Sequence, residues 1–90
     1  MATQYNVTLL TIDKDTGHTI DVKEEIVVVS KRDEENGYVR LHVATAILQH
    51  FPHDVVNANW SKDLSGWTVF LPHLPLFWKI ITSFDKDVPE

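Results

Sequence analysis

In the stretch Ile26-Val27-Val28-Val29-Ser30-Lys31-Arg32-Asp33-Glu34-Glu35, the residue pattern changes at Ser30. The fold prediction starts from this change. The β-branched residues before Ser30 favour a strand. Ser30 is a good N-cap, Asp33 stands three residues later as in a capping box, and the acidic run suits the positive end of a helix dipole. We therefore predict that a strand ends and a helix begins here, with the helix running over about residues 31–49.

A hairpin is predicted upstream of this junction. Residues 4–12 alternate in polarity and indicate a first strand, and the polar turn 13–17 ends in a glycine that permits chain reversal. A second strand begins near His18. The even-numbered residues of that strand are apolar from Ile20 to Val28 except at Glu24. This exception predicts either a bulge at Glu24-Glu25 or an exposed strand end. The apolar even-numbered residues are Ile20, Val22, Ile26 and Val28.

Gly37 leaves two alternatives for the helix. It costs about 1 kcal/mol relative to Ala inside a helix, and close contact between helix and sheet would explain its presence. Otherwise Asn36-Gly37 forms a turn and the helix begins only at Tyr38. We expect the long helix, ended by Pro52.

A second hairpin and a short helix are predicted after Pro52. Strands over residues 55–61 and 67–71 flank a polar turn at 62–66. Apolar residues at helical spacing then predict a C-terminal helix, followed by a flexible polar tail at 85–90. These apolar residues are Leu74, Phe77, Trp78, Ile81 and Phe84.

The predicted order is β-β-α-β-β-α, in a single domain spanning residues 1–90. We expect an α+β fold in which two hairpins form a four-stranded antiparallel sheet, packed against one main helix and the short C-terminal helix. Two hairpins around a central helix also fit the strand pairing of a ubiquitin-like fold. Thr16-Gly17-His18-Thr19-Ile20 is faintly similar to that family, but the match is too short to assign it.

The composition excludes several classes of function. The chain has 90 residues, a net charge of −5 and no cysteine, so disulfides and thiolate metal sites are excluded and a cytoplasmic location is expected. The N-terminus does not resemble a signal peptide, and no apolar run is long enough to span a bilayer. The eight basic residues are scattered, which argues against nucleic acid as a partner.

Metal binding and catalysis also find little support. His50 and His53 are three residues apart, with Asp54 adjacent, but Pro52 prevents the two histidines from sharing one helix face. We expect His50 to cap the helix C-terminus, and we predict neither a metal nor a cofactor. The glycines are isolated and no serine lies in a nucleophile elbow, so we expect a protein that is not an enzyme.

The aromatic residues of the C-terminal third offer a candidate interface, because Trp and Phe side chains serve as interface anchors. The alternative is that they close a small core. We predict partner-binding anchors at Trp60, Trp67, Phe77 and Trp78. We also predict that an acidic cluster steers the protein toward a partner with a basic surface. This cluster comprises Asp33, Glu34 and Glu35.

We therefore expect a small acidic module that binds a protein and catalyses no reaction. In type, although in no matched motif, the chain resembles small accessory proteins of phages and mobile elements, many of which bind and inhibit host proteins. A structural subunit or homodimer is the first alternative. A small His-dependent metal protein or enzyme that uses His50, His53 and Asp54 is the second.

Overall fold

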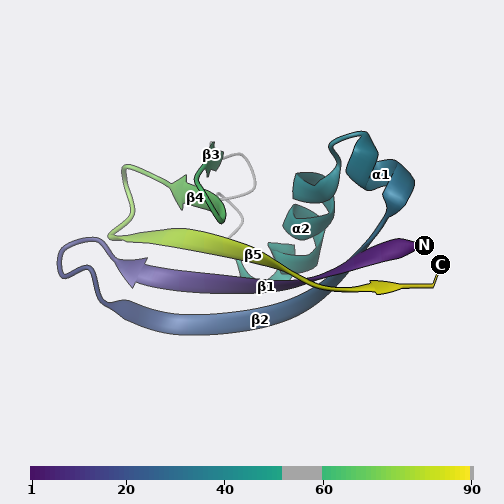
Figure 1. Cartoon of the computed structure of the whole chain (residues 1–90). Coiled ribbons are helices and arrows are strands. Elements are labelled where there is room, and N and C mark those ends of the chain that lie inside the picture. Colours follow the sequence, from purple (N-terminus) through teal and green to yellow (C-terminus); the bar gives the residue numbers. More distant parts are fainter. Residues whose placement is uncertain (52–59, 90) are drawn as a thin grey trace.

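The computed structural model describes residues 1–51 and 60–89 of the chain. A single antiparallel sheet organises them, with the strand order β2-β1-β5-β4-β3 (Figure 1). The strands are β1 (Ala2–Asp13), β2 (Thr19–Ser30), β3 (Trp60–Lys62), β4 (Gly66–Phe70) and β5 (Leu76–Val88). The helices are α1 (Lys31–Glu35), α2 (Val39–Ile47) and the 3₁₀ turn η1 (Leu48–His50).

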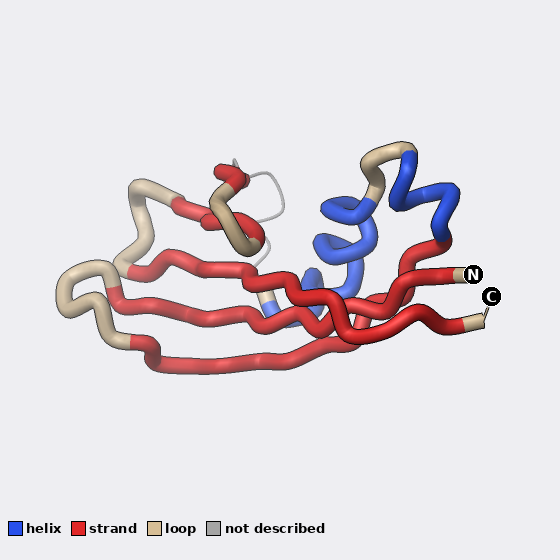
Figure 2. Tube along the Cα trace, viewed as in Figure 1, coloured by secondary structure: helices blue, strands red, loops and turns tan. Residues whose placement is uncertain are grey.

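Strand β1 lies between the edge strand β2 and the middle strand β5 and pairs with both. It pairs with β2 on one side, from Ala2 opposite Ser30 to Ile12 opposite Thr19. On its other side it pairs with β5, from Ala2 opposite Val88 to Asp13 opposite Leu76. The β3–β4 hairpin extends the sheet beyond β5 and curves toward the side on which the helices lie (Figure 2).

The core lies between the sheet and α2. Val43 and Ile47 of α2 are fully buried, and two alternate residues from each of β1, β2, β4 and β5 are buried with them. A fully buried aliphatic side chain contributes about 1.5–3 kcal/mol relative to an exposed one, so this single layer of contacts holds the helix on the sheet. The strand residues of the core are Val7, Leu9, Val27, Val29, Trp67, Val69, Trp78 and Ile80.

The predicted C-terminal helix is wrong, and with it the four-stranded sheet and the β-β-α-β-β-α order. Residues 76–88 form strand β5, so the sheet has five strands. Trp78 and Ile80 are buried while Lys79 between them is exposed, which is the period of two that a strand requires. The strand also contains residues 85–88, where the sequence predicts a tail.

The predicted long helix is also wrong. Ser30 caps α1 as expected, since its hydroxyl accepts a hydrogen bond from the Asp33 N–H at 3.1 Å. The helix then stops at Asn36, because Gly37 adopts a positive φ of 80°. The Asn36-Gly37 turn of the alternative prediction is present, and α2 begins at Val39, one residue after the predicted start at Tyr38.

The first hairpin is confirmed; of the two alternatives for Glu24, the bulge is wrong, whereas residues 19–24 are exposed, as the other alternative predicts. Glu24 and Glu25 pair regularly with Thr8 and Val7, and the register shifts between Thr11 and Ile12 instead. The predicted strand over residues 55–61 lies mostly outside the described residues, where only β3 from Trp60 onward is seen. None of the described helices is both long and apolar enough to cross a membrane.

Candidate partner-binding surface

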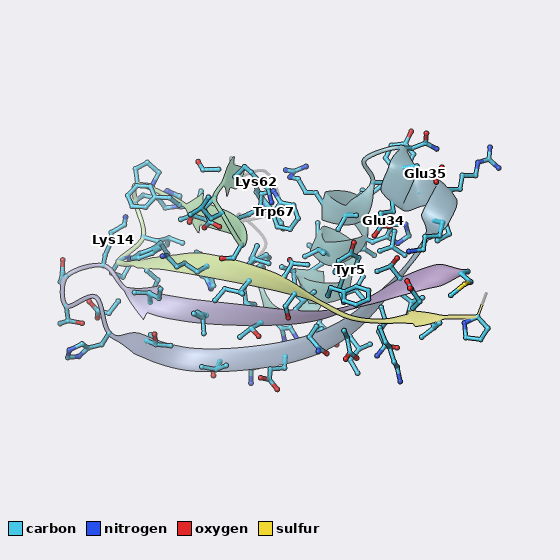
Figure 3. All side chains as sticks on the ribbon, in the orientation of Figure 1. Tyr5, Lys14, Glu34, Glu35, Lys62 and Trp67 are labelled. Atoms are coloured by element: carbon cyan, nitrogen blue, oxygen red, sulfur yellow. The ribbon has the colours of Figure 1, made fainter. Side chains whose placement is uncertain are left out.

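The predicted aromatic anchors lie mainly in the core. Trp78 is 3% exposed and Trp67 is 8% exposed, so neither presents appreciable surface to a partner. Trp67 lies on the helix side of β4, where Lys62 Nζ approaches its ring at 4.5 Å (Figure 3). Trp67 and Trp78 therefore belong to the buried core that the sheet forms with α2.

Trp60 and Phe77 are partly buried. The Trp60 ring stands edge-on to Phe51, with 6.1 Å between ring centroids, and the Arg40 guanidinium lies 5.0 Å from its centroid. Trp60 also lines a small hollow of about 220 Å³ beside α2. Phe77 pairs with Phe70 at the far end of the sheet. The four predicted anchors therefore do not form one continuous exposed surface.

The acidic residues of α1 mostly fasten the helix to the sheet. Glu34 accepts hydrogen bonds from the hydroxyls of Tyr5 and Thr3 and lies 3.7 Å from Lys31 Nζ. Asp33 binds His42 Nε2 at 2.8 Å. Glu35 is exposed near the end of α1 (Figure 3). The predicted steering cluster thus has one freely exposed carboxylate and two that serve the fold.

The Tyr5–Glu34 contact changes the pKa of both groups. The Tyr5 hydrogen bond is the main cause that lowers the pKa of Glu34, with further bonds from Thr3 and Lys31. Burial, followed by the hydrogen bond to Glu34, raises the pKa of Tyr5 to about 12. The contact therefore favours an ionised Glu34 and a neutral Tyr5.

Tyr5→Phe should raise the pKa of Glu34 toward its ordinary value. A carboxyl with a lowered pKa stabilises the fold above its unfolded pKa, and this stability is lost as the pH falls through its folded pKa. The variant should therefore be less stable at pH 7 and should lose less stability on acidification. NMR titration of Glu34, with urea unfolding at pH 7 and below pH 4, measures both effects. Tyr38→Phe is the control, because Tyr38 is exposed; an unchanged Glu34 pKa in Tyr5→Phe would contradict the assignment.

The histidines do not assemble a metal site within the described residues. His50 Nε2 lies 2.8 Å from Glu25 Oε1, and the Gln49 amide donates to the same oxygen at 3.0 Å. These contacts attach η1, the turn that follows α2, to β2. No group of three or more His, Asp or Glu side chains with metal-binding geometry occurs in residues 1–51 and 60–89. His53 and Asp54 lie outside the described residues.

The surface that the sequence prediction missed is the sheet face opposite the helices, here called the open face. Figure 2 shows both helices on one side of the sheet. Strand alternation places the neighbours of the buried Val27 and Val29 on the other side, where Ile26 is 64% exposed and Val28 is 48% exposed. Val22 and Phe70 are also about half exposed. A shallow hollow of about 690 Å³ lies over β1 and β2 beside Glu24 and Ile26.

The backbone of β2 points alternately toward β1 and away from it. The Lys31 N–H donates to the Met1 carbonyl across β1–β2, which directs odd-numbered residues of β2 toward β1. The Thr82 N–H donates to the Ser65 carbonyl at 2.8 Å, and so turns away from its β1 partner Val7. The backbone of Val7 is therefore hydrogen-bonded to β2, opposite Glu25. This agrees with the direction of the odd-numbered β2 residues inferred from Lys31. The residues that direct N–H and C=O groups to the free edge are Val22, Glu24, Ile26 and Val28.

β2 thus combines an open edge with an apolar face on the same residues. The backbone groups of its even-numbered residues point away from β1 and meet no other strand of the described residues, and their side chains lie on the open face. Such an edge is a template for another strand. At the opposite edge of the sheet, the structure describes three residues of β3. No family model, curated protein or solved structure matched the chain in the comparisons.

Proposed function

We propose that the protein is a non-catalytic module that binds another protein by adding an extended strand of that protein to the outer edge of β2. The observation that carries this proposal is the coincidence, on β2, of outward backbone groups and exposed apolar side chains. Main-chain hydrogen bonds supply affinity in this mode of binding, and alternate side chains supply specificity.

The chemistry of β2 defines the partner strand. Val22 and Ile26 favour apolar residues on the open face of the added strand. Between them lie Lys23, Glu24 and Glu25, whose charges favour a partner strand that carries a basic residue opposite Glu25. This refines the expected preference for a basic partner, and it transfers the predicted interface from the indoles to β2.

The outer edge of β2 has few of the features that prevent other strands from pairing with an exposed edge. Proteins usually protect edges with short strands, prolines, bulges or charges. β2 has twelve residues, and its pairing with β1 is regular from Asp21 to Ser30. Its charges cluster in the middle, while the segment 26–29 is entirely β-branched. The proposal retains a cytoplasmic location.

Quantitative affinity capture with edge variants tests the proposal. Ile26→Pro removes one outward N–H and places a ring in the path of an added strand. The fold should tolerate this proline because Ile26 lies on an edge strand. Val22→Thr with Ile26→Thr keeps β-branching and removes apolar contact area. Lys62→Pro is the matched control, because Lys62 occupies the outer edge of β3.

Wild type and Lys62→Pro should capture the same proteins in the same amounts. A second copy of the chain counts as a captured protein. Both β2 variants should reduce that capture by about tenfold or more, at unchanged circular dichroism. Equal capture by wild type and Ile26→Pro, or no specific capture by the wild type, would contradict the proposal.

A further inference from the structure

We propose that the strand added to β2 is β2 of a second copy of this chain, paired antiparallel about a two-fold axis at Glu24. This inference rests on the proposed function, since it names the partner of the same edge. The two five-stranded sheets would become one continuous sheet. With the axis perpendicular to the sheet, both open faces lie on the same side and merge into one surface.

The sequence of β2 is nearly self-complementary about Glu24. In an antiparallel pair centred there, Val22 of one copy lies opposite Ile26 of the other, on the open face. Lys23 lies opposite Glu25, and the symmetry makes this pair twice. Opposite charges and apolar pairs directly across two strands stabilise their pairing.

The backbone directions agree with this register. Val22, Glu24 and Ile26 direct their N–H and C=O groups outward, so they form the hydrogen-bonded pairs across the new ladder. In the described part of the chain no element lies beyond the outer edge of β2, which forms the lower border of the sheet in Figure 1.

Neighbouring registers are less favourable. An axis at Lys23 sets Asp21 against Glu25, a like-charge pair, and Val22 against Glu24. An axis at Glu25 sets Glu24 against Ile26 and leaves Lys23 opposite Val27. Only the register centred on Glu24, among these three, gives both the apolar pair and the ion pair.

The preferred register has one adverse contact, because the two Glu24 side chains meet at the axis. Like charges directly opposite each other destabilise a strand pair. Glu24→Gln should therefore strengthen the dimer by several-fold. Glu24 is exposed, so this substitution should leave the folded monomer intact.

Charge variants at the flanking positions supply the decisive test, read as mass by sedimentation velocity over a range of protein concentrations. Wild type should convert from one to two chains as its concentration rises. Lys23→Glu alone and Glu25→Lys alone should each weaken the dimer by about tenfold or more, because each sets like charges together twice. An equimolar mixture of these two variants should form a heterodimer, because both opposite-charge pairs are restored.

Thermal unfolding checks that each variant folds, because Glu25 also binds Gln49 and His50. If Glu25→Lys does not fold, the opposite effects of Glu24→Gln and Lys23→Glu still decide the matter. A single-chain mass for wild type and for Glu24→Gln at all concentrations would overturn self-pairing, as would a dimer unaffected by Lys23→Glu. If the wild type stays a single chain while Ile26→Pro still loses a captured protein, self-pairing fails and the proposed function stands.

Discussion

Trp78→Ala should lower the free energy of unfolding by about 3–5 kcal/mol, the range for removing a large aromatic side chain from a core. Trp78 is 3% exposed, lies on β5 between β1 and β4, and packs edge-on against Phe51 at 5.7 Å between ring centroids. A small domain has only about 5–15 kcal/mol in total. The substitution should therefore remove much of the stability of this fold.

Urea unfolding followed by circular dichroism measures the effect of Trp78→Ala. Phe84→Ala is the matched control, because Phe84 lies on the same strand with 61% of its surface exposed. The control should change stability by less than about 1 kcal/mol. Equal small effects of the two substitutions would show that Trp78 is not a core residue.

Gly66→Ala should destabilise the protein by about 3 kcal/mol, at the upper end of the usual cost of overpacking. A Cβ at Gly66 would lie 1.8 Å from the carbonyl oxygen and 2.9 Å from the carbonyl carbon of Ile80. Both atoms belong to the backbone of β5, so the clash can be relieved only by moving β4 away from β5. The substitution should therefore weaken the β4–β5 pairing.

Gly17→Ala is the comparison for Gly66→Ala. A Cβ at Gly17 would meet no atom within 4 Å, but the φ of Gly17 is +75°, so the cost should be about 1–2 kcal/mol from backbone strain. Thermal unfolding of both variants measures the difference. A Gly66→Ala variant as stable as Gly17→Ala would contradict the close approach of β4 and β5.

Local signals in the sequence predicted the first hairpin and the start of α1. Asp13 accepts hydrogen bonds from the N–H groups of Asp15 and Thr16, and Gly17 takes the positive φ that the turn needs. Ser30 caps α1 through its hydroxyl. Each of these features is determined by residues within a few positions, which is why the sequence reveals them.

The error in the C-terminal segment arose from an ambiguous pattern. Phe77, Trp78 and Ile81 fit a helical spacing, but Ile80-Ile81-Thr82 is also β-branched and favours a strand. Pairing with β1 along its full length selects the strand. That pairing joins the two ends of the chain, and no local window of sequence contains it.

The candidate surface was missed because both parities of residues 26–29 are apolar. The sequence therefore does not show which side of β2 faces α2. The structure buries Val27 and Val29 and exposes Ile26 and Val28. Glu24 and Ile26 lie on the same face of β2, and the charge of Glu24 is the one signal in the sequence that marks this face as exposed.

Residue-resolved amide exchange, measured by NMR at low and high protein concentration, tests most directly whether the edge of β2 accepts another strand. At low concentration the amides of Glu24 and Ile26 should exchange rapidly while those of Glu25 and Val27 are protected. At high concentration the Glu24 and Ile26 amides should become protected together. Exchange at these two amides that stays rapid at every concentration, or an alternation opposite to this one, would contradict the account.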